Sequence, residues 1–236
     1  MAAHVALDVL REYVAQVGKF CVDADYREIV LLRLFSARNL HQTSVVTRMD
    51  RYPGVFSLCR QYFEGRTDVR ILSFGCATGE EVLTIRGYFP SAFILGAEVN
   101  RRSLARCRTL KVDDRIAFTY SDHDRIVQQG PFDAVFCMAV LQRGPHSVER
   151  QQVPNIRLIY PFEKFDDQVT RLDSVLRKNG LLVISHSQYD LGDASVGGKY
   201  EPLDLGPHNR SARFDRNGDR KPLASRSASV FVKARD

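Results

Sequence analysis

Two features of the sequence, a turn bounded by glycines and an acidic residue some twenty positions later, have the types and spacing of a nucleotide-binding site. An apolar run over residues 69–74 stops at Gly75, and a turn of small residues follows as far as Gly79. Glycine lets the backbone turn sharply and approach a ligand, and the first turn of a following helix offers free N–H groups. A second apolar run, residues 92–97, ends at Glu98, where a carboxylate can accept hydrogen bonds from both hydroxyls of a ribose.

The charges of this turn limit the type of cofactor. A dinucleotide fingerprint has three glycines, whereas the turn has only the pair Gly75 and Gly79. Glu80 and Glu81 stand where a pyrophosphate would bring negative charge and would repel it. A ligand with an amino group and a sulfonium, S-adenosyl-L-methionine, would instead attract a carboxylate. The simpler alternative is an ordinary α/β turn whose acids stabilise a helix N-terminus; the spacing to Glu98 favours the cofactor site.

Residues 73–81, Ser-Phe-Gly-Cys-Ala-Thr-Gly-Glu-Glu, resemble the first motif of the class I S-adenosylmethionine-dependent methyltransferases. Ala77 replaces the middle glycine of that motif, and Ser73 stands where many members carry an acid. The loop is also similar to that of the chemotaxis receptor methyltransferases, a likeness confined to these residues. The likeness to the wider class covers residues 70–187 by the order of the elements. It implies an α/β, Rossmann-like fold with a seven-stranded, mostly parallel sheet and helices on both faces.

The same resemblance implies S-adenosyl-L-methionine as cofactor, S-adenosyl-L-homocysteine as product and a set of binding residues. Asp122 follows the expected third strand, residues 116–120, and is predicted to face the adenine, with Asp124 capping the next helix; the alternative is that Asp122 is itself the cap. Cys137, Met138 and Ala139 end the expected fourth strand beside the methyl group, with core packing as the alternative. The predicted cofactor-binding residues are Gly75, Cys76, Thr78, Gly79, Glu81, Glu98, Asp122 and Cys137.

Helical periodicity within residues 1–66 predicts helices in front of the cofactor-binding domain, residues 67–236, and the resemblance implies that they form an N-terminal lid. The alternatives are that these helices cover a sheet edge or form the contact of a homodimer. His41 and Arg48 fall in a polar link between the helices, where we expect His41 to be solvated.

The second half of the chain is predicted to supply the substrate side. Residues 143–165 form a loop-rich insertion with three prolines, where His146, Tyr160 and Phe162 are candidates for substrate selection. The alternative for Tyr160 and Phe162 is burial against the helix that follows. A helix over residues 165–178 and a fifth strand over 181–185 follow, with His186 at the end of that strand. Residues 190–210 are expected to form a mobile loop. The final stretch, with its Asn-Gly hairpin signal at 217–218, predicts antiparallel sixth and seventh strands.

Composition narrows the remaining choices. The net charge of +6 is spread among acids rather than blocked into tracts, which argues against a nucleic-acid partner. Five widely spaced cysteines suggest neither a disulfide framework nor a zinc site, and no acidic cluster suggests a metal. With no apolar run long enough for a membrane span and no signal-peptide pattern, we expect a cytoplasmic protein without membrane contact.

These observations predict a methyltransferase that transfers a methyl group to an oxygen or nitrogen atom of a small-molecule acceptor by in-line displacement. His146 or His186 could serve as the general base, the alternative being that both are structural. Two other functions stay open: a protein that binds the cofactor without methylating, and an RNA methyltransferase, for which Arg143, Arg150 and Arg157 would supply positive charge at the insertion.

Overall fold

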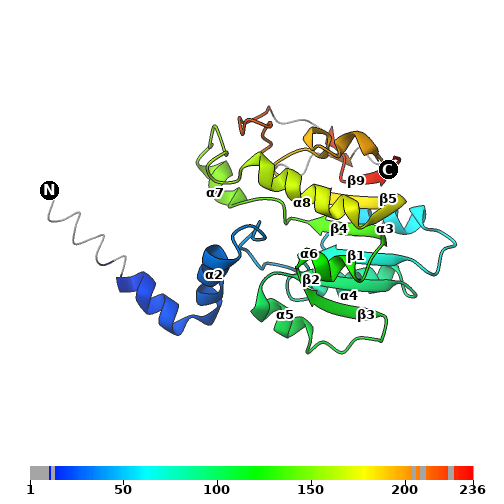
Figure 1. The fold of residues 1–236 in the computed structure, drawn as a ribbon, viewed down its shortest axis with the longest axis horizontal. Coiled ribbons are helices and arrows are strands. Elements are labelled where there is room, and N and C mark those ends of the chain that lie inside the picture. Colours follow the sequence, from blue (N-terminus) through cyan, green and yellow to red (C-terminus); the bar gives the residue numbers. More distant parts are fainter. Residues whose placement is uncertain (1–10, 12–13, 204–205, 208–210, 223–225, 236) are drawn as a thin grey trace.

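A twisted, mostly parallel β-sheet forms the centre of the molecule (Figure 1). The computed structural model describes residues 11, 14–203, 206–207, 211–222 and 226–235. The sheet has seven strands in the order β3-β2-β1-β4-β5-β9-β6, and β9 is the one strand of this sheet that runs opposite to the other six. This confirms the predicted Rossmann-like α/β fold. The strands are β1 (Arg70–Phe74), β2 (Phe93–Glu98), β3 (Ile116–Tyr120), β4 (Phe132–Met138), β5 (Leu176–Ser185), β6 (Tyr200–Pro202) and β9 (Val230–Lys233); β7 (Gly206–Pro207) and β8 (Arg226–Ser227) pair separately.

Helices cover both faces of the sheet because its central strands are apolar on both sides. On one face, α3 (Pro53–Tyr62), α4 (Glu80–Tyr88) and α5 (Arg101–Cys107) pack on strand residues such as Ile71 and Phe136. On the other, α6 (His123–Val127), α7 (Pro145–Arg150) and α8 (Phe162–Ser174) pack on residues such as Leu72 and Val135. The strand order reverses between β1 and β4, so a crevice opens at their carboxyl ends.

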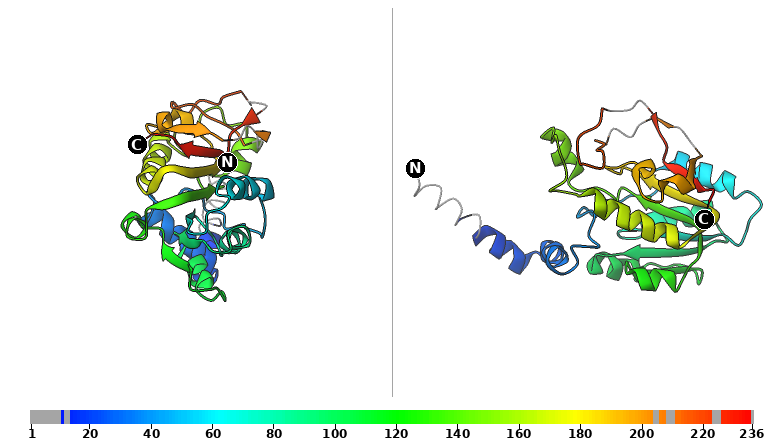
Figure 2. Two further views of the ribbon diagram at one scale, coloured as in Figure 1. Left: turned by 90° about the vertical axis from the view of Figure 1, so that its right-hand side faces the viewer. Right: turned by 45° about the horizontal axis from the view of Figure 1, so that its top comes forward.

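The N-terminal helices lie at one end of the domain. Residues 14–22 are helical and are followed by α2 (Ala24–Phe35), and Figures 1 and 2 show this part projecting away from the sheet. Asp25 of α2 pairs with Arg102 of α5 at 2.7 Å, and Glu28 accepts a hydrogen bond from the Arg101 N–H. Several apolar side chains here are exposed, including those of Val22 and Phe35. A homodimer contact through these helices stays a prediction.

Three predicted elements differ from the structure. Helix α8 ends at Ser174 instead of residue 178, and Asn179 and Gly180 lie inside β5, where the pairing with β4 jumps from Leu176 to Leu181. The polar residues 177–180, which resemble a helix end, instead form an irregularity in the strand. The insertion contains α7, so it is not loop throughout.

The segment predicted as a mobile loop, residues 190–210, contains secondary structure. It forms two short 3-10 helices, Leu191–Asp193 and Gly197–Lys199, and then β6. Leu191 and Val196 belong to the core. That the segment is mobile stays a prediction. Residues 204–205 and 208–210 lie outside the described part. The Asn217-Gly218 turn joins an isolated bridge between Phe214 and Arg220 and does not connect strands of the main sheet.

None of the described helices has the length and apolar character needed to cross a membrane.

A buried acid ties three strands together at the amino edge of the sheet. Asp133 of β4 accepts hydrogen bonds from the Arg70 N–H at 2.8 Å, from Arg66 at 3.1 Å and from Arg177 at 3.0 Å. Burial opposes ionisation, but the Arg70 N–H and the two guanidiniums outweigh it and hold the pKa of Asp133 below its usual value. Asp133 is therefore an ionised residue of β4 that links this strand to β1 and β5.

Replacing Asp133 by alanine should lower the free energy of unfolding by about 2–3 kcal/mol, because a buried backbone N–H and two guanidiniums lose their partner. Urea denaturation at pH 7 measures the change. Asp68→Ala is the control: this exposed side chain also pairs with Arg66, at 3.4 Å, and its loss should cost less than about 0.5 kcal/mol. Equal effects of the two variants would contradict the assignment.

Candidate functional site

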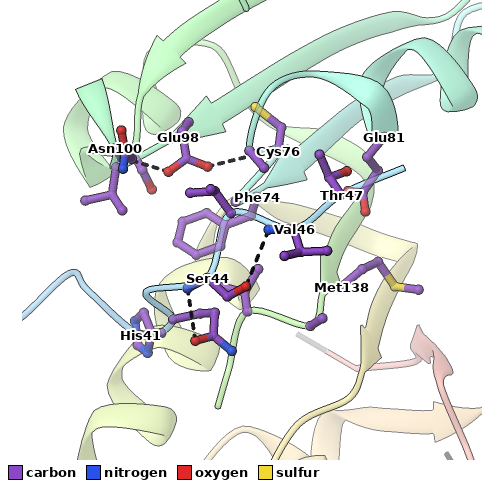
Figure 3. A pocket seen from close by; sticks show the side chains of 18 of the residues that line it. His41, Ser44, Val46, Thr47, Phe74, Cys76, Glu81, Glu98, Asn100 and Met138 are labelled. Atoms are coloured by element: carbon purple, nitrogen blue, oxygen red, sulfur yellow. Dashed lines mark hydrogen bonds between the residues drawn. The ribbon is translucent and has the colours of Figure 1, made fainter. Parts of the chain in front are cut away.

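A cavity of about 980 Å³, the solvent at its mouth included, lies at the carboxyl edge of the sheet. Its floor is the turn after β1 and the ends of β2 and β4, and its cover is the segment 36–52, which we call the strap. Glu98 and Asn100 lie at one end of the cavity, and Glu81 and Met138 lie at the other (Figure 3).

Glu98 is held rigidly at the first end of the cavity. One of its carboxylate oxygens accepts a hydrogen bond from the Ala77 N–H at 2.8 Å and the other from the Asn100 N–H at 2.7 Å. Burial raises the pKa of Glu98, and these N–H groups offset part of that effect. Because each carboxylate oxygen has two acceptor positions, both oxygens can still accept from the hydroxyls of a ligand.

Glu81 provides a second carboxyl group at the opposite end. It lies in the first turn of α4 and accepts a hydrogen bond from the buried Ser73 hydroxyl at 2.7 Å. Burial raises the pKa of Glu81 to about 7. Ser73 is the last residue but one of β1, at the position where the family that the sequence resembles often has an acid, and the Glu81 carboxyl lies next to it. Burial disfavours the negative charge on Glu81, and a cation bound next to this carboxyl would favour its ionised form and pair with it.

The backbone around the cavity is strained in the way that functional sites often are. Gly75 has φ +78°, and a Cβ there would lie 2.5 Å from a methyl group of Val140. Ala77 (φ 49°), Ala139 (φ 59°) and His186 (φ 53°) follow β1, β4 and β5 in the left-handed region, although none is glycine. Such conformations cost about 1–3 kcal/mol each and persist where the surroundings impose them. All four positions lie at the carboxyl edge.

The first part of the strap is hydrogen-bonded to the insertion and to α8. The His41 imidazole is buried, with Nδ1 2.7 Å from the Tyr160 hydroxyl and Nε2 3.3 Å from Gln168 Oε1. Because Oε1 only accepts, Nε2 carries the proton and Nδ1 accepts from Tyr160. Arg143 and Lys164 donate to the Leu40 carbonyl at 2.9 and 2.8 Å. Burial and the Lys164 charge lower the pKa of His41 to about 3, so the imidazole is neutral.

The second part of the strap is fastened to α4. The Asp50 N–H donates to the Thr84 hydroxyl at 2.9 Å, and the Tyr88 hydroxyl donates to the Asp50 carboxylate at 3.0 Å. Val46, between the two fastenings, lines the cavity and has an exposed side chain. The cover is thus a segment held at both ends. That it opens as a lid stays a prediction.

Of the predicted cofactor-binding residues, Gly75, Cys76, Glu81 and Glu98 line the cavity. The other four do not, and each has a structural role. Thr78 donates to Glu80, and Gly79 is the N-cap of α4 with φ +101°. Asp122 caps α6 by accepting from the Arg125 N–H at 3.4 Å, so the cap that we expected of Asp124 is made by Asp122. Cys137 is buried in the core on the other face of β4, because neighbouring strand residues point to opposite sides.

Neither predicted general base lines the cavity. His146 is exposed on α7. His186 packs against Tyr52, with ring centroids 5.5 Å apart, and so lies behind a residue of the cavity wall. The expectation that His41 is solvated was wrong, because the strap is folded back against the Tyr160 hydroxyl. Tyr160 itself is buried, as its alternative assignment predicted.

Sequence reasoning missed the residues that the strap contributes. Ser44, Thr47, Arg48, Arg51 and Tyr52 line the cavity together with Asn100 and Ser121 of the domain. The only sequence signal for them was the polar composition of the link between two helices. Among the described residues, no group of three or more His, Cys, Asp or Glu side chains is placed to hold a metal ion.

Comparison with known proteins gives likenesses of structure. No family model matches the chain, and no curated protein matches it. The chain is similar to TehB from Haemophilus influenzae (12% identity, TM-score 0.48, 79% of this chain and 64% of that one). It is also similar to the plantazolicin methyltransferase BpumL in complex with SAH, with 16% identity and a TM-score of 0.42 over 78% of this chain and 62% of that one. A third similar structure is precorrin-6y C5,15-methyltransferase from Geobacter metallireducens GS-15, with 14% identity and a TM-score of 0.40 over 60% of this chain and 66% of that one.

The chain thus spans less than two thirds of the length of each of these three proteins. At these identities and TM-scores, the likenesses do not identify the reaction of this chain. Its function has to be inferred from the residues of the cavity.

The free protein should respond to pH through Glu81. Its carboxyl has a pKa of about 7 when folded and about 4.5 when unfolded, so its favourable contribution is complete below pH 4.5 and is lost as the pH rises through 7. Glu81→Gln removes the ionisation and should be more stable than wild type at pH 8, by about 1–3 kcal/mol, but not at pH 4.5. Thermal unfolding across this range gives the difference, which should not appear for Glu80→Gln.

His41→Ala should loosen the strap, because it removes two hydrogen bonds and leaves the buried Tyr160 hydroxyl unpaired. We expect hydrogen exchange of the amides of residues 39–48 to accelerate at least about tenfold, with no change in the central strands. His146→Ala, which changes an exposed histidine outside the cavity, should leave this protection as in wild type. Unchanged exchange in His41→Ala would show that the strap is held by its other contacts.

Proposed function

We propose that this chain is an S-adenosyl-L-methionine-dependent methyltransferase acting on an oxygen or nitrogen atom of a small-molecule acceptor. The observation that carries the proposal is the pair of carboxyl groups, Glu98 and Glu81, at the two ends of one cavity. Glu98 would bind the ribose hydroxyls, and Glu81 would pair with the amino group of the methionine part. The spacing of strand, turn, helix and acid in the sequence gives the same assignment.

The residues of the cavity fit this cofactor better than they fit a dinucleotide. A pyrophosphate would have to approach Glu81, and the two like charges would repel each other. Gly75 lets the turn pack closely against Val140, because a Cβ there would lie 2.5 Å from a methyl group of that residue. Asn100 and Ser121 add polar groups at the Glu98 end, where an adenosine would lie.

The contribution of the protein to the reaction is mainly positioning. When bound, S-adenosyl-L-methionine supplies a methyl group on a positively charged sulfur. Glu98 and Glu81 would fix the two ends of the cofactor, and Met138 and Ala139 at the end of β4 would line the reaction centre. The strap covers the cavity and limits access of water. Holding the acceptor in line with the methyl group is worth several kcal/mol in reactions of this kind.

Glu98→Ala should weaken the binding of S-adenosyl-L-homocysteine about 10- to 100-fold, because two hydrogen bonds from a charged acceptor to the ribose are lost. Isothermal titration calorimetry measures this. Glu201→Ala, on the exposed surface of β6, is the matched control and should bind like wild type. If wild type fails to bind S-adenosyl-L-homocysteine, or if Glu98→Ala binds equally well, the proposal is wrong.

Turnover separates a methyltransferase from a protein that only binds the cofactor. Release of S-adenosyl-L-homocysteine with a panel of small hydroxyl, carboxyl and amino compounds is the measurement. Tight cofactor binding without any product would favour the binding protein.

The RNA alternative predicts a steep salt dependence of RNA binding. In the structure, Arg143 at the insertion is engaged with the Leu40 carbonyl of the strap.

A further inference from the structure

The hydroxyl of Tyr52 is buried without a hydrogen-bond partner among the described residues. Its position is well fixed, because the ring packs against His186 and the Arg51 guanidinium lies 5.2 Å from the ring centroid. The Tyr52 carbonyl accepts from the Val55 and Phe56 N–H groups at the start of α3. Buried hydroxyls are normally paired, so an unpaired one on a residue of the cavity wall calls for a partner that the described chain does not supply.

Tyr52 lies on the opposite side of the cavity from the proposed ribose site. The strand order places β2, with Glu98, on one side of β1, and β4 and β5 on the other. Tyr52 contacts His186, which follows β5, whereas Glu98 ends β2. A cofactor that reaches from Glu98 to Glu81 would therefore leave the Tyr52 hydroxyl for a second molecule.

The charges around Tyr52 indicate what that molecule carries. Burial raises the pKa of Tyr52, and the charged groups facing it are Arg51, Glu81 and Arg48. Among the described residues of the cavity wall, the acids are Glu81 and Glu98, both of which the proposed function assigns to the cofactor. The two arginines and the positive sulfur of the cofactor then favour an acceptor with negative charge.

We propose that the Tyr52 hydroxyl donates a hydrogen bond to the methyl acceptor, and that this acceptor is a small molecule with an ionised oxygen. This inference rests on the proposed function. The acceptor oxygen forms a bond to the methyl carbon as the carbon–sulfur bond breaks, and that electron pair returns to sulfur. The negative oxygen and the positive sulfur both become neutral. An acceptor that is already ionised needs no general base, which agrees with the position of His146 and His186 outside the cavity wall.

The first test is the stability of the free protein. Tyr52→Phe removes a buried hydroxyl that has no partner, so its Tm should equal or exceed that of wild type. Tyr62→Phe is the matched control, because the Tyr62 hydroxyl donates to the Asn179 carbonyl at 3.0 Å, far from the cavity; its Tm should fall slightly. A drop of several degrees in Tyr52→Phe would show that the hydroxyl has a structural partner, and the inference would be wrong.

The second test is calorimetry at pH 8 on the protein saturated with S-adenosyl-L-homocysteine, using 4-nitrophenolate and benzoate as probes because the oxygen of each is ionised at that pH. We expect wild type to bind at least one probe, with 4-nitrophenolate indicating a phenolate acceptor and benzoate a carboxylate. Tyr52→Phe should weaken that binding at least tenfold and change the affinity for S-adenosyl-L-homocysteine less than twofold, whereas Tyr62→Phe should match wild type in both.

Each other outcome of the calorimetry overturns the inference. Failure of both probes to bind wild type would exclude this acceptor class. Equal probe binding by Tyr52→Phe would exclude the hydroxyl as a contact, and loss of cofactor affinity in that variant would assign Tyr52 to the cofactor. These results differ from a failure of the proposed function, in which wild type does not bind S-adenosyl-L-homocysteine at all.

Discussion

The pair of hydrogen bonds that Glu98 accepts, from the Ala77 and Asn100 N–H groups, determines the geometry of the whole site. They connect the turn after β1 to Asn100, the N-cap of α5, and so hold the carboxyl ends of β1 and β2 together. The turn accepts left-handed backbone at Ala77 to make this contact, a conformation that an alanine adopts only when its surroundings compensate. A site held this rigidly loses little entropy when a ligand binds.

The strap supplies side chains above the carboxyl edge, which the Rossmann-like sheet itself lacks. A parallel sheet supplies strand ends and backbone N–H groups at its carboxyl edge, but few side chains that reach over a ligand. The strap places Arg48, Arg51 and Tyr52 above that edge and is held there by contacts to α4, α8 and the insertion. Selectivity for an acceptor can therefore change in the strap without disturbing the sheet.

The parts of the structure that could be predicted from sequence depend on local patterns. The runs ending at Phe74 and Glu98, and the glycines between them, identify the first βαβ unit because strand, turn and helix leave periodic signals. Contacts between distant segments leave no such signal. Nothing near His41 indicates a partner at Tyr160, and nothing in Asn179-Gly180 distinguishes a helix end from a strand irregularity. Spacing alone does not show which way a side chain points, so it could not show that Asp122 caps α6 or that Cys137 packs in the core.

The contact between His41 and Tyr160 joins residues that are 119 positions apart, and Lys164 reaches back to Leu40 over 124. During synthesis, the amino-terminal segment emerges long before its partners exist, so these contacts cannot form until residues 1–164 of the 236 have left the ribosome. A chain built in this way would be exposed to aggregation and to chaperones for longer than one whose site comes from neighbouring segments.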